Sequence, residues 1–401
     1  MTKNKEKYHL LQVLRSSDYK LIALLMVMLL GLLFSRALLS ISMLVWLIVI
    51  LISWGKCNFF RSDNDMLYWS IVPLILFLTG AWQLPFQKDT YDFLLTLCTY
   101  PIAFFSVTML KNLKNISIIN KIWVIVAIAG CIYPISWFIT HIQASITRYG
   151  SGQTLPVWMD NDHIRYSIFL CSALVMLLFH NPFSLRLRWI LVSLLLILIL
   201  FLSVRTAWII LIICLLFIPF SKSIPQRKWI TVSIILLGFC SYIFFPTVQK
   251  KIAYSFYEWQ QFNPSVFNSN YSDGARRNMN TIALEAIQQK QYNIGWAGVA
   301  PTMQQIGRTY FSQQNLKFGW PFNQWLFWLI GSGWIGVIAW SIWLLYPIFW
   351  AWQQKQIGVA VWSIAITASC LVECNLNYQF GVFLHAWPLA LMALSPQRSS
   401  L

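Results

Sequence analysis

The sequence predicts an all-α integral membrane protein with about twelve transmembrane helices and one large external loop. Hydrophobic residues make up 58% of the 401 residues, and charged residues only 10%. Apolar runs long enough to cross a bilayer fill most of the chain, and one polar, aromatic-rich segment, 249–320, interrupts them late. A soluble core cannot accommodate this much apolar surface, so lipid is the expected solvent.

The formal net charge of +17 fits the same class. In a soluble protein, such an excess of Lys and Arg would suggest nucleic-acid binding. Here the basic residues concentrate in short connections between apolar runs, where they set membrane topology and meet anionic headgroups. The sequence therefore predicts membrane lipids as partners and no nucleic acid.

An apolar run of about twenty residues crosses the hydrocarbon core as a helix, and shorter runs suffice where flanking side chains snorkel. This criterion predicts spans at 21–34, 37–54, 67–82, 93–110, 116–139, 164–179, 189–202, 206–220, 229–245, 324–350, 357–372 and 381–394. The chain divides into helices one to nine over 1–248, an external loop or cap over 249–321, and helices ten to twelve over 322–401. Gly31 with Ser35-Arg36 also allows a re-entrant hairpin in place of the first two spans.

Lys and Arg in short loops predict the orientation, because they favour the cytoplasmic side. With the N-terminus inside, the cytoplasmic connections hold Lys56, Arg61, Lys111, Lys114, Arg186, Arg188, Lys222, Arg227, Lys228, Lys355 and Arg398, whereas the opposite ones hold Arg36, Lys88, Arg148 and Arg165. Both termini are therefore expected in the cytoplasm, and segment 249–320 on the outer face.

The outer segment is too rich in Tyr, Trp and Phe to be disordered. Apolar residues at helical spacing over 279–287 predict at least one helix in it. A second outer loop, 143–163, ends in the cluster Asp160-Asn161-Asp162-His163-Ile164-Arg165. We expect an ordered cap on the outer face.

One arginine lies where two apolar stretches meet without a loop, in Ser203-Val204-Arg205-Thr206-Ala207-Trp208. Ionisable groups at that depth are costly and usually functional, although an arginine at a helix end can also snorkel to lipid phosphates. More cations are expected on the same face, namely Arg165, Arg276, Arg277 and Lys317. Several guanidinium groups at a membrane surface suit a diphosphate, because their planar forks bind phosphate oxygens bidentately.

The second half of the chain carries an ordered set of short motifs around its outer loop. They are Ser203-Val204-Arg205-Thr206-Ala207-Trp208, Ser272-Asp273-Gly274-Ala275-Arg276 with Ala283-Leu284 following, Ile294-Gly295-Trp296-Ala297-Gly298, Pro321-Phe322-Asn323, and Ile330-Gly331-Ser332-Gly333-Trp334-Ile335-Gly336. In order, in spacing, and in the large loop before the tenth span, this set resembles the O-antigen ligase family. The first half agrees with that family only in hydropathy.

The resemblance implies a GT-C-type membrane glycosyltransferase, independent of metals and cofactors, on the periplasmic face of a bacterial inner membrane. It would take a glycan from undecaprenyl diphosphate and transfer it to an acceptor, which for the ligases proper is the lipid A core. By the matched motifs, Arg205 and Arg276 would hold the diphosphate and neutralise the charge that develops on it. The further substrate-binding candidates are Arg165, Arg277, Lys317 and Trp320.

The chain departs from the family at one position. The family has a His-Asn pair whose histidine is the proposed base, but this chain has Phe322-Asn323, and phenylalanine cannot accept a proton. Asn323 can still orient a sugar hydroxyl. The candidate bases on the same face are Asp160, Asp162, His163 and Asp273. Asp160 or Asp162 is also explained as the N-cap of the sixth span.

Aromatic residues in or beside the outer loop allow two interpretations. Trp296, Tyr310, Trp320 and Trp325 could stack on sugar rings or brace an isoprenoid chain, or they could belong to the interfacial belt of a membrane protein. His385, inside the last span, is expected to be a packed polar contact rather than a catalyst.

Several alternative functions remain open from the sequence. A related polymerase joins carrier-linked repeats to one another, and an oligosaccharyltransferase modifies protein hydroxyls. A transporter or flippase is a different class, but the spans show no matched pair of Gly- or Pro-broken helices. Phe322 also suggests a relative that binds lipid-linked glycan without turning it over.

Overall fold

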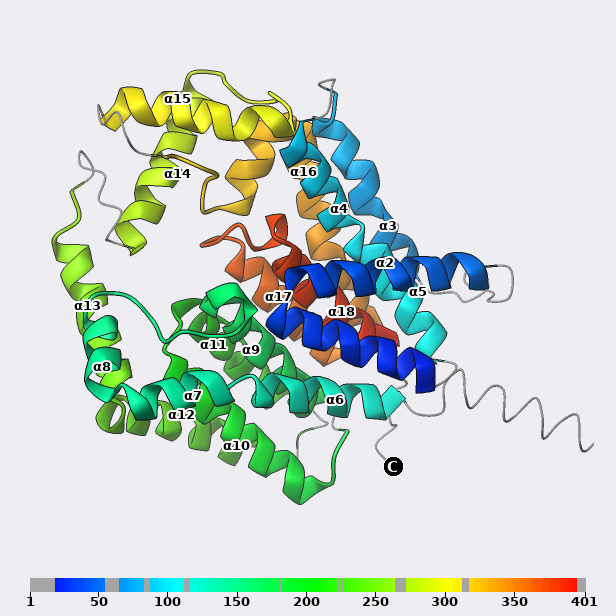
Figure 1. The fold of residues 1–401 in the computed structure, drawn as a ribbon, viewed down its shortest axis with the longest axis vertical. Helices are drawn as coiled ribbons and strands as arrows, with labels where there is room; N and C mark the ends of the chain where they lie inside the picture. Colours follow the sequence, from blue (N-terminus) through cyan, green and yellow to red (C-terminus); the bar gives the residue numbers. More distant parts are fainter. Residues whose placement is uncertain are drawn as a thin grey trace, which may run out of the picture.

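The computed structural model describes residues 19–54, 65–82, 87–111, 116–180, 182–221, 224, 227–263, 272–311 and 317–394. Within these ranges the chain forms helices and irregular connections, with no strand (Figure 1). Lys56, Arg61, Lys114, Lys222 and Arg398, which the orientation argument used, lie outside the described residues. The predicted all-α class is confirmed.

The order of the elements follows the apolar pattern of the sequence. After a first helix, Tyr19–Phe34, come α2 (Arg36–Ser53), α3 (Asp65–Phe77), η2 (Leu78–Gly80), α4 (Lys88–Leu97), α5 (Thr99–Lys111), α6 (Ile116–Ala129), α7 (Ile132–Thr140), α8 (Ile142–Gly150), η3 (Met159–Asn161), α9 (His163–Phe179), α10 (Leu185–Leu202), α11 (Arg205–Phe217), η4 (Ile218–Phe220), α12 (Arg227–Phe244), α13 (Pro246–Gln260), α14 (Ser272–Gln288), η5 (Trp296–Gly298), α15 (Val299–Phe311), α16 (Gln324–Gln353), α17 (Ile357–Ser369), η6 (Asn375–Asn377) and α18 (Gln379–Leu394).

Six helical segments of the described chain are long and apolar enough to cross a membrane. They are Arg36–Ser53, Lys88–Leu110, Ser117–Thr140, Leu185–Leu202, Arg227–Phe244 and Gln324–Gln353. Six shorter apolar segments are Tyr19–Phe34, Asp65–Gly80, His163–Phe179, Arg205–Phe220, Ile357–Ser369 and Gln379–Leu394. The helices fit a multi-pass membrane protein, while the count of twelve spans and the side of each loop stay predictions.

The first two apolar helices form a tight hairpin, drawn in blue in Figure 1. Ser35 caps α2 by accepting a hydrogen bond from the backbone N–H of Leu38 at 3.3 Å. A Cβ at Gly31 would lie 2.6 Å from the backbone nitrogen of Leu39. The glycine therefore allows the two helices to touch backbone to backbone.

The helices α9, α17 and α18 form the interior of the bundle. Every side chain of α18 from Phe380 to Leu394 is buried, against α5, α9 and α17. Near the middle of α18, His385 Nδ1 lies 2.8 Å from the hydroxyl of Tyr100, with the rings of Trp69 and Trp343 edge-on to the imidazole. His385 is thus a packed polar contact, as expected.

The outer segment is bound to this bundle by backbone hydrogen bonds at a break in α16. Gly333 has φ 69° and ψ −170°, a conformation that glycine adopts readily. The break leaves carbonyl groups free one turn earlier, and the backbone N–H groups of Ile294 and Gly295 donate to those of Ile330 and Gly331 at 3.0 and 2.9 Å. Two of the family-like glycine motifs therefore bind each other through the backbone.

Trp296 follows this backbone pairing and fills the interior beneath it. Only 3% of its surface is exposed, its ring stacks on Phe327, and its indole N–H donates to the carbonyl of Phe77 at 2.8 Å. The hypothesis that Trp296 contacts a sugar is therefore wrong, because the residue belongs to the core. Buried indole N–H groups usually have such a partner.

We expect Gly331→Ala to destabilise the protein, because the new Cβ would meet ring atoms of Trp296 at 2.5 Å. Overpacking of this kind costs about 1–3 kcal/mol. Thermal unfolding in detergent measures the loss. The matched control is Gly238→Ala in α12, where a Cβ meets nothing within 4 Å. Equal unfolding temperatures for the two variants would contradict the assigned contact.

The outer segment forms three helices, α13, α14 and α15, which lie along one side of the molecule at the left and top of Figure 1. The helix expected at 279–287 lies within α14, and its apolar residues Met279, Ile282, Ala283 and Ala286 are buried. Because α14 packs on α13, α15 and α16, its first turn is held opposite the N-terminus of α11.

Candidate active site

Arg205 is placed by a sharp junction between two helices. Helix α10 ends at Leu202, Ser203 adopts a left-handed conformation with φ 52°, Val204 is extended, and α11 begins at Arg205. The Ser203 hydroxyl donates to the carbonyl of Leu200 at 2.8 Å and satisfies part of the helix end. Arg205 is thus fixed in the first turn of α11, as the absence of a loop in the sequence predicted.

A cation at a helix N-terminus is unfavourable, because the helix dipole is positive there. Carboxylates from the outer segment offset this cost. Arg205 Nη1 binds Asp273 Oδ2, lies 3.8 Å from Glu258 Oε2 and donates to the Ser255 hydroxyl at 3.2 Å. Helices α11, α13 and α14 therefore meet at the guanidinium group of Arg205.

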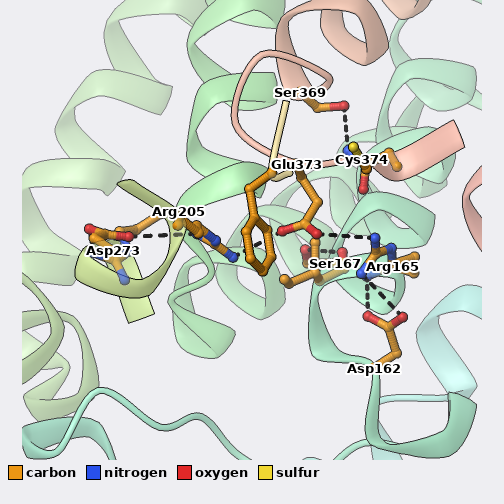
Figure 2. Close-up of polar contacts among 12 residues, drawn as sticks. Asp162, Arg165, Ser167, Arg205, Asp273, Ser369, Glu373 and Cys374 are labelled. Carbon is orange, nitrogen blue, oxygen red and sulfur yellow. Dashed lines mark hydrogen bonds and ion pairs between the residues drawn. The ribbon is translucent and has the colours of Figure 1, made fainter. Parts of the chain in front are cut away.

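Asp273 is shared between two arginines. While its Oδ2 binds Arg205, its Oδ1 lies 3.6 Å from Nη1 of Arg276, one turn further along α14. Figure 2 shows the contact between Arg205 and Asp273. The two arginines that the motifs singled out are thus a single carboxylate apart.

Glu373 continues the contacts on the far side of Arg276. Its side chain is 3% exposed, with Oε2 at 3.1 Å from Arg276 Nη2 and Oε1 at 3.4 Å from Arg165 Nη2. Arg165 also lies 3.5 Å from Asp162, and its guanidinium group stacks on the ring of Tyr378 at 4.4 Å. In Figure 2, Glu373 lies between Arg205 with Asp273 on one side and Arg165 with Asp162 on the other.

We call this series the ion-pair chain; in order it comprises Arg205, Asp273, Arg276, Glu373, Arg165 and Asp162. Cations and anions alternate along it, so every charge is paired although the site is partly buried. Buried charges persist only when they are paired in this way. An arriving anion must therefore compete with the carboxylates for the arginines.

The backbone around Glu373 is fixed by the N-terminus of α16. Gln324 donates its backbone N–H to the carbonyl of Cys370 at 3.0 Å and its side-chain amide to Asn377 Oδ1 at 2.6 Å. The Cys374 thiol donates to the carbonyl of Pro321 at 2.9 Å. The turn 370–377 is therefore held on both sides of Glu373.

A further cation, Lys251 on α13, lies beside the ion-pair chain. Its Nζ donates to the carbonyl of Gly152 at 2.6 Å. Burial lowers the pKa of Lys251 to about 8, and the nearby charge of Arg205 adds to the effect. Lys251 is consequently charged at neutral pH and loses its charge as the pH rises past about 8.

A comparison with known protein families identifies part of the chain. Residues 189–341 match the model of the O-antigen ligase family. This part of the chain is similar to the O-antigen ligase family. The match contains Arg205, Asp273 and Arg276, whereas Arg165 and Glu373 lie outside it. No curated protein matches the chain.

This match confirms the resemblance seen in the motifs and indicates a membrane glycosyltransferase-like enzyme of the O-antigen ligase and polymerase type. The family match therefore supports the class of enzyme, whereas the role proposed for each residue is argued from the geometry of the site. Within the described ranges, no group of three or more His, Cys, Asp or Glu residues is placed to hold a metal ion.

The structure brings Arg205, Arg276, Arg165 and Asp162 together. Asp162 is also the N-cap of α9, because its Oδ1 accepts a hydrogen bond from the backbone N–H of Arg165 at 3.1 Å. The capping interpretation of this aspartate is correct. His163, the first residue of α9, is close enough for the charges of Asp162, Lys251 and Arg276 to act on its imidazole.

The side chain of Asn323 forms its hydrogen bonds with backbone groups. Its Oδ1 caps α16 by accepting from the N–H groups of Trp325 and Leu326 at 2.9 and 3.2 Å, and its amide donates to the carbonyl of Leu371 at 3.2 Å. This geometry favours a positioning role over contact with a sugar. Phe322 beside it faces Arg276, with the guanidinium group 5.6 Å from the ring centroid.

The other residues proposed to contact the substrate lie outside the ion-pair chain. Arg277 is exposed and stacks on Phe262 at 5.1 Å, and Lys317 is exposed with no ion pair to a described residue. Trp320 packs on Tyr378 at 5.7 Å, which places it next to the ring beneath Arg165. Asp160 instead pairs with Arg36.

Glu373 and Glu258 were not among the site residues predicted from the sequence. Glu373 carries the same signal as Arg205, an ionisable residue between two apolar runs, and that signal was sufficient to find it. Glu258 is 2% exposed and accepts from the backbone N–H of Gly274 at 3.0 Å, so it caps α14 from another helix. A cap supplied by a distant segment has no local sequence signature.

Proposed function

We propose that this protein transfers a glycan from undecaprenyl diphosphate to an acceptor, the lipid A core, on the periplasmic face of a bacterial inner membrane. The observation that carries the proposal is the pair of arginines, Arg205 and Arg276, on two separate helices and bound to one carboxylate. Two forks so close together fit two neighbouring phosphate groups.

In the reaction, the bond between the anomeric carbon and the diphosphate oxygen breaks, and negative charge grows on the leaving diphosphate. Arg205 and Arg276 would stabilise this charge more strongly in the transition state than in the bound donor, which is the requirement for catalysis. Arg165 and Lys251 would add to the positive potential. The arginines thus supply the charge that a divalent cation supplies in many other enzymes that act on phosphates.

Transfer should persist when divalent metals are removed. We expect purified protein in liposomes to move glycan from a polyprenyl diphosphate donor to the acceptor at an unchanged rate in excess EDTA, because guanidinium groups supply the positive charge. Gel analysis of the labelled product measures the rate. Activity that disappears with EDTA and returns with Mg²⁺ would contradict this mechanism.

The acceptor distinguishes the ligase from its relatives. Deleting the gene for a ligase leaves long polymer on the carrier, deleting a polymerase leaves single repeats, and deleting an oligosaccharyltransferase leaves proteins unglycosylated. Carrier-linked glycans and glycoproteins in the deletion strain are the measurement. Both termini are expected in the cytoplasm, in keeping with a periplasmic site.

Phe322 supports a second candidate, a relative that binds lipid-linked glycan without transferring it. The phenylalanine stands where the family has its proposed base and contacts Arg276. A strong gain of transfer in Phe322→His would favour this candidate. No gain, or a loss, would indicate that the base lies elsewhere in the site.

A further inference from the structure

We infer that Asp273 accepts the proton of the acceptor hydroxyl, and that the diphosphate of the donor releases it for this role by taking over its two arginines. The inference rests on the proposed function and names the base that this function leaves open. It is drawn from the position of one carboxylate, which is the counter-ion of both Arg205 and Arg276.

Asp273 is the acid of the ion-pair chain best placed to reach a substrate. Its side chain is 34% exposed, compared with 18% for Asp162 and 3% for Glu373. Asp162 is committed to capping α9, and Glu373 to two arginines inside the bundle. Only Asp273 combines contact with both proposed diphosphate ligands and access from outside.

Binding of a diphosphate changes the surroundings of this carboxylate. A diphosphate offers more charge and more acceptor oxygens than one carboxylate, so it displaces Asp273 from the two guanidinium groups. Asp273 then has phosphate oxygens for neighbours in place of cations, and nearby negative charge favours protonation of a carboxylate. The donor itself therefore prepares the base.

The other charges around Asp273 either raise its proton affinity as well or do not change when the donor binds. Glu258 on α13 accepts a hydrogen bond from the backbone N–H of Asp273 and adds a second negative charge. Lys251 on α13 opposes it but stays protonated below pH 8, and Glu373 lies beyond Arg276. His163 on α9 is near Lys251 and Arg276. A change in proton affinity on donor binding is thus assigned to the loss of the arginines.

The position of Phe322 agrees with this assignment. Arg276 contacts both the Phe322 ring, 5.6 Å from its guanidinium group, and Asp273, 3.6 Å from its Nη1. The family's proposed base and Asp273 would therefore lie beside the same arginine. Either position can serve a hydroxyl that approaches a diphosphate bound to Arg276.

The step balances without a co-reactant. The acceptor oxygen forms a bond to the anomeric carbon, and its proton moves to Asp273. The bond from that carbon to the diphosphate oxygen breaks, and the diphosphate leaves with the electron pair. When the carrier diphosphate departs, Arg205 and Arg276 return to Asp273, and the proton passes to water.

The test compares Asp273→Asn with wild-type protein in liposomes. Asparagine keeps an oxygen for the arginines but cannot accept a proton, so kcat is expected to fall about 10²- to 10⁴-fold. Binding of inorganic diphosphate, measured by calorimetry, should be as tight or tighter because a competing charge is gone. Glu285→Gln, on the same helix, is the control with unchanged kcat. A kcat within about threefold of wild type, or diphosphate binding lost by the same factor as kcat, would overturn the inference.

The pH dependence of kcat gives an independent readout. Wild-type protein should lose activity as the pH falls, because a protonated carboxyl group cannot accept the proton of the acceptor, and Asp273→Glu should keep this acid limb. If Asp273→Asn does not fold, these two proteins suffice, since a flat wild-type profile would overturn the assignment. An acid limb removed by His163→Gln and kept by Asp273→Asn would overturn it as well. By contrast, wild-type protein without transfer activity would refute the proposed function itself.

Discussion

Replacing Arg205 with alanine is expected to lower kcat for glycan transfer by about 10²- to 10³-fold, the usual cost of removing one group that stabilises charge in a transition state. The side chain is fixed at the first turn of α11, and its Nη1 contacts Asp273, Glu258 and Ser255. Alanine would remove one of the two proposed diphosphate ligands and leave Arg276 as the other. Initial rates with a polyprenyl diphosphate donor measure the effect.

Two further substitutions make this experiment specific. Arg205→Lys keeps the charge but loses the planar fork, so we expect activity between those of alanine and wild type. Arg308→Ala, an exposed arginine in the last turn of α15, is the matched control and should transfer normally. Folded Arg205→Ala protein with full activity would reject the assignment of the site.

The fold class, the junction at Arg205 and the N-cap at Asp162 could be predicted from the sequence, because each depends on a local pattern. Apolar runs of sufficient length specify helices in lipid. The junction before Arg205 is visible as two runs without a loop, and the structure forms it with a left-handed Ser203. The N-cap at Asp162 is likewise a signal within four residues.

The ion pairs of Glu373 could not be predicted, because they join distant segments of the chain. Glu373 is 208 residues from Arg165 and 97 from Arg276, and no periodicity in the sequence reports such a contact. The core position of Trp296 was missed for the same reason, because it follows from the break at Gly333 and the backbone pairing that this break permits. Whether an aromatic residue beside the outer loop lies at the membrane interface or in the core is determined by tertiary packing.

The ion-pair chain connects the part of the molecule that matches the family to parts that do not. Arg205, Asp273 and Arg276 lie within residues 189–341, whereas Arg165 and Glu373 come from α9 and from the turn before α18. The α9 segment is almost entirely buried against α17 and α18. The family domain therefore depends on the bundle around it to complete its charge balance.

Replacing Glu373 with glutamine is expected to destabilise the protein by about 3–5 kcal/mol, the cost of leaving a buried ion pair without one partner. The carboxylate is 3% exposed and lies between Arg165 and Arg276. Glutamine retains the shape but not the charge, so Arg165 would keep only Asp162, and Arg276 only Asp273, as a counter-ion. Thermal unfolding in detergent measures the loss, and Glu285→Gln on the surface of α14 is the control.

A double substitution separates this electrostatic cause from a packing defect. If repulsion between the arginines is responsible, Arg165→Gln in the Glu373→Gln background should restore part of the stability, because one of the two cations that shared the lost carboxylate is removed. A packing defect would make the double variant at least as unstable as the single one. Arg276 would still lack its anchor in both proteins, so the KM for the donor should remain raised even where stability recovers. Recovery of stability without recovery of KM would identify Glu373 as the residue that positions Arg276.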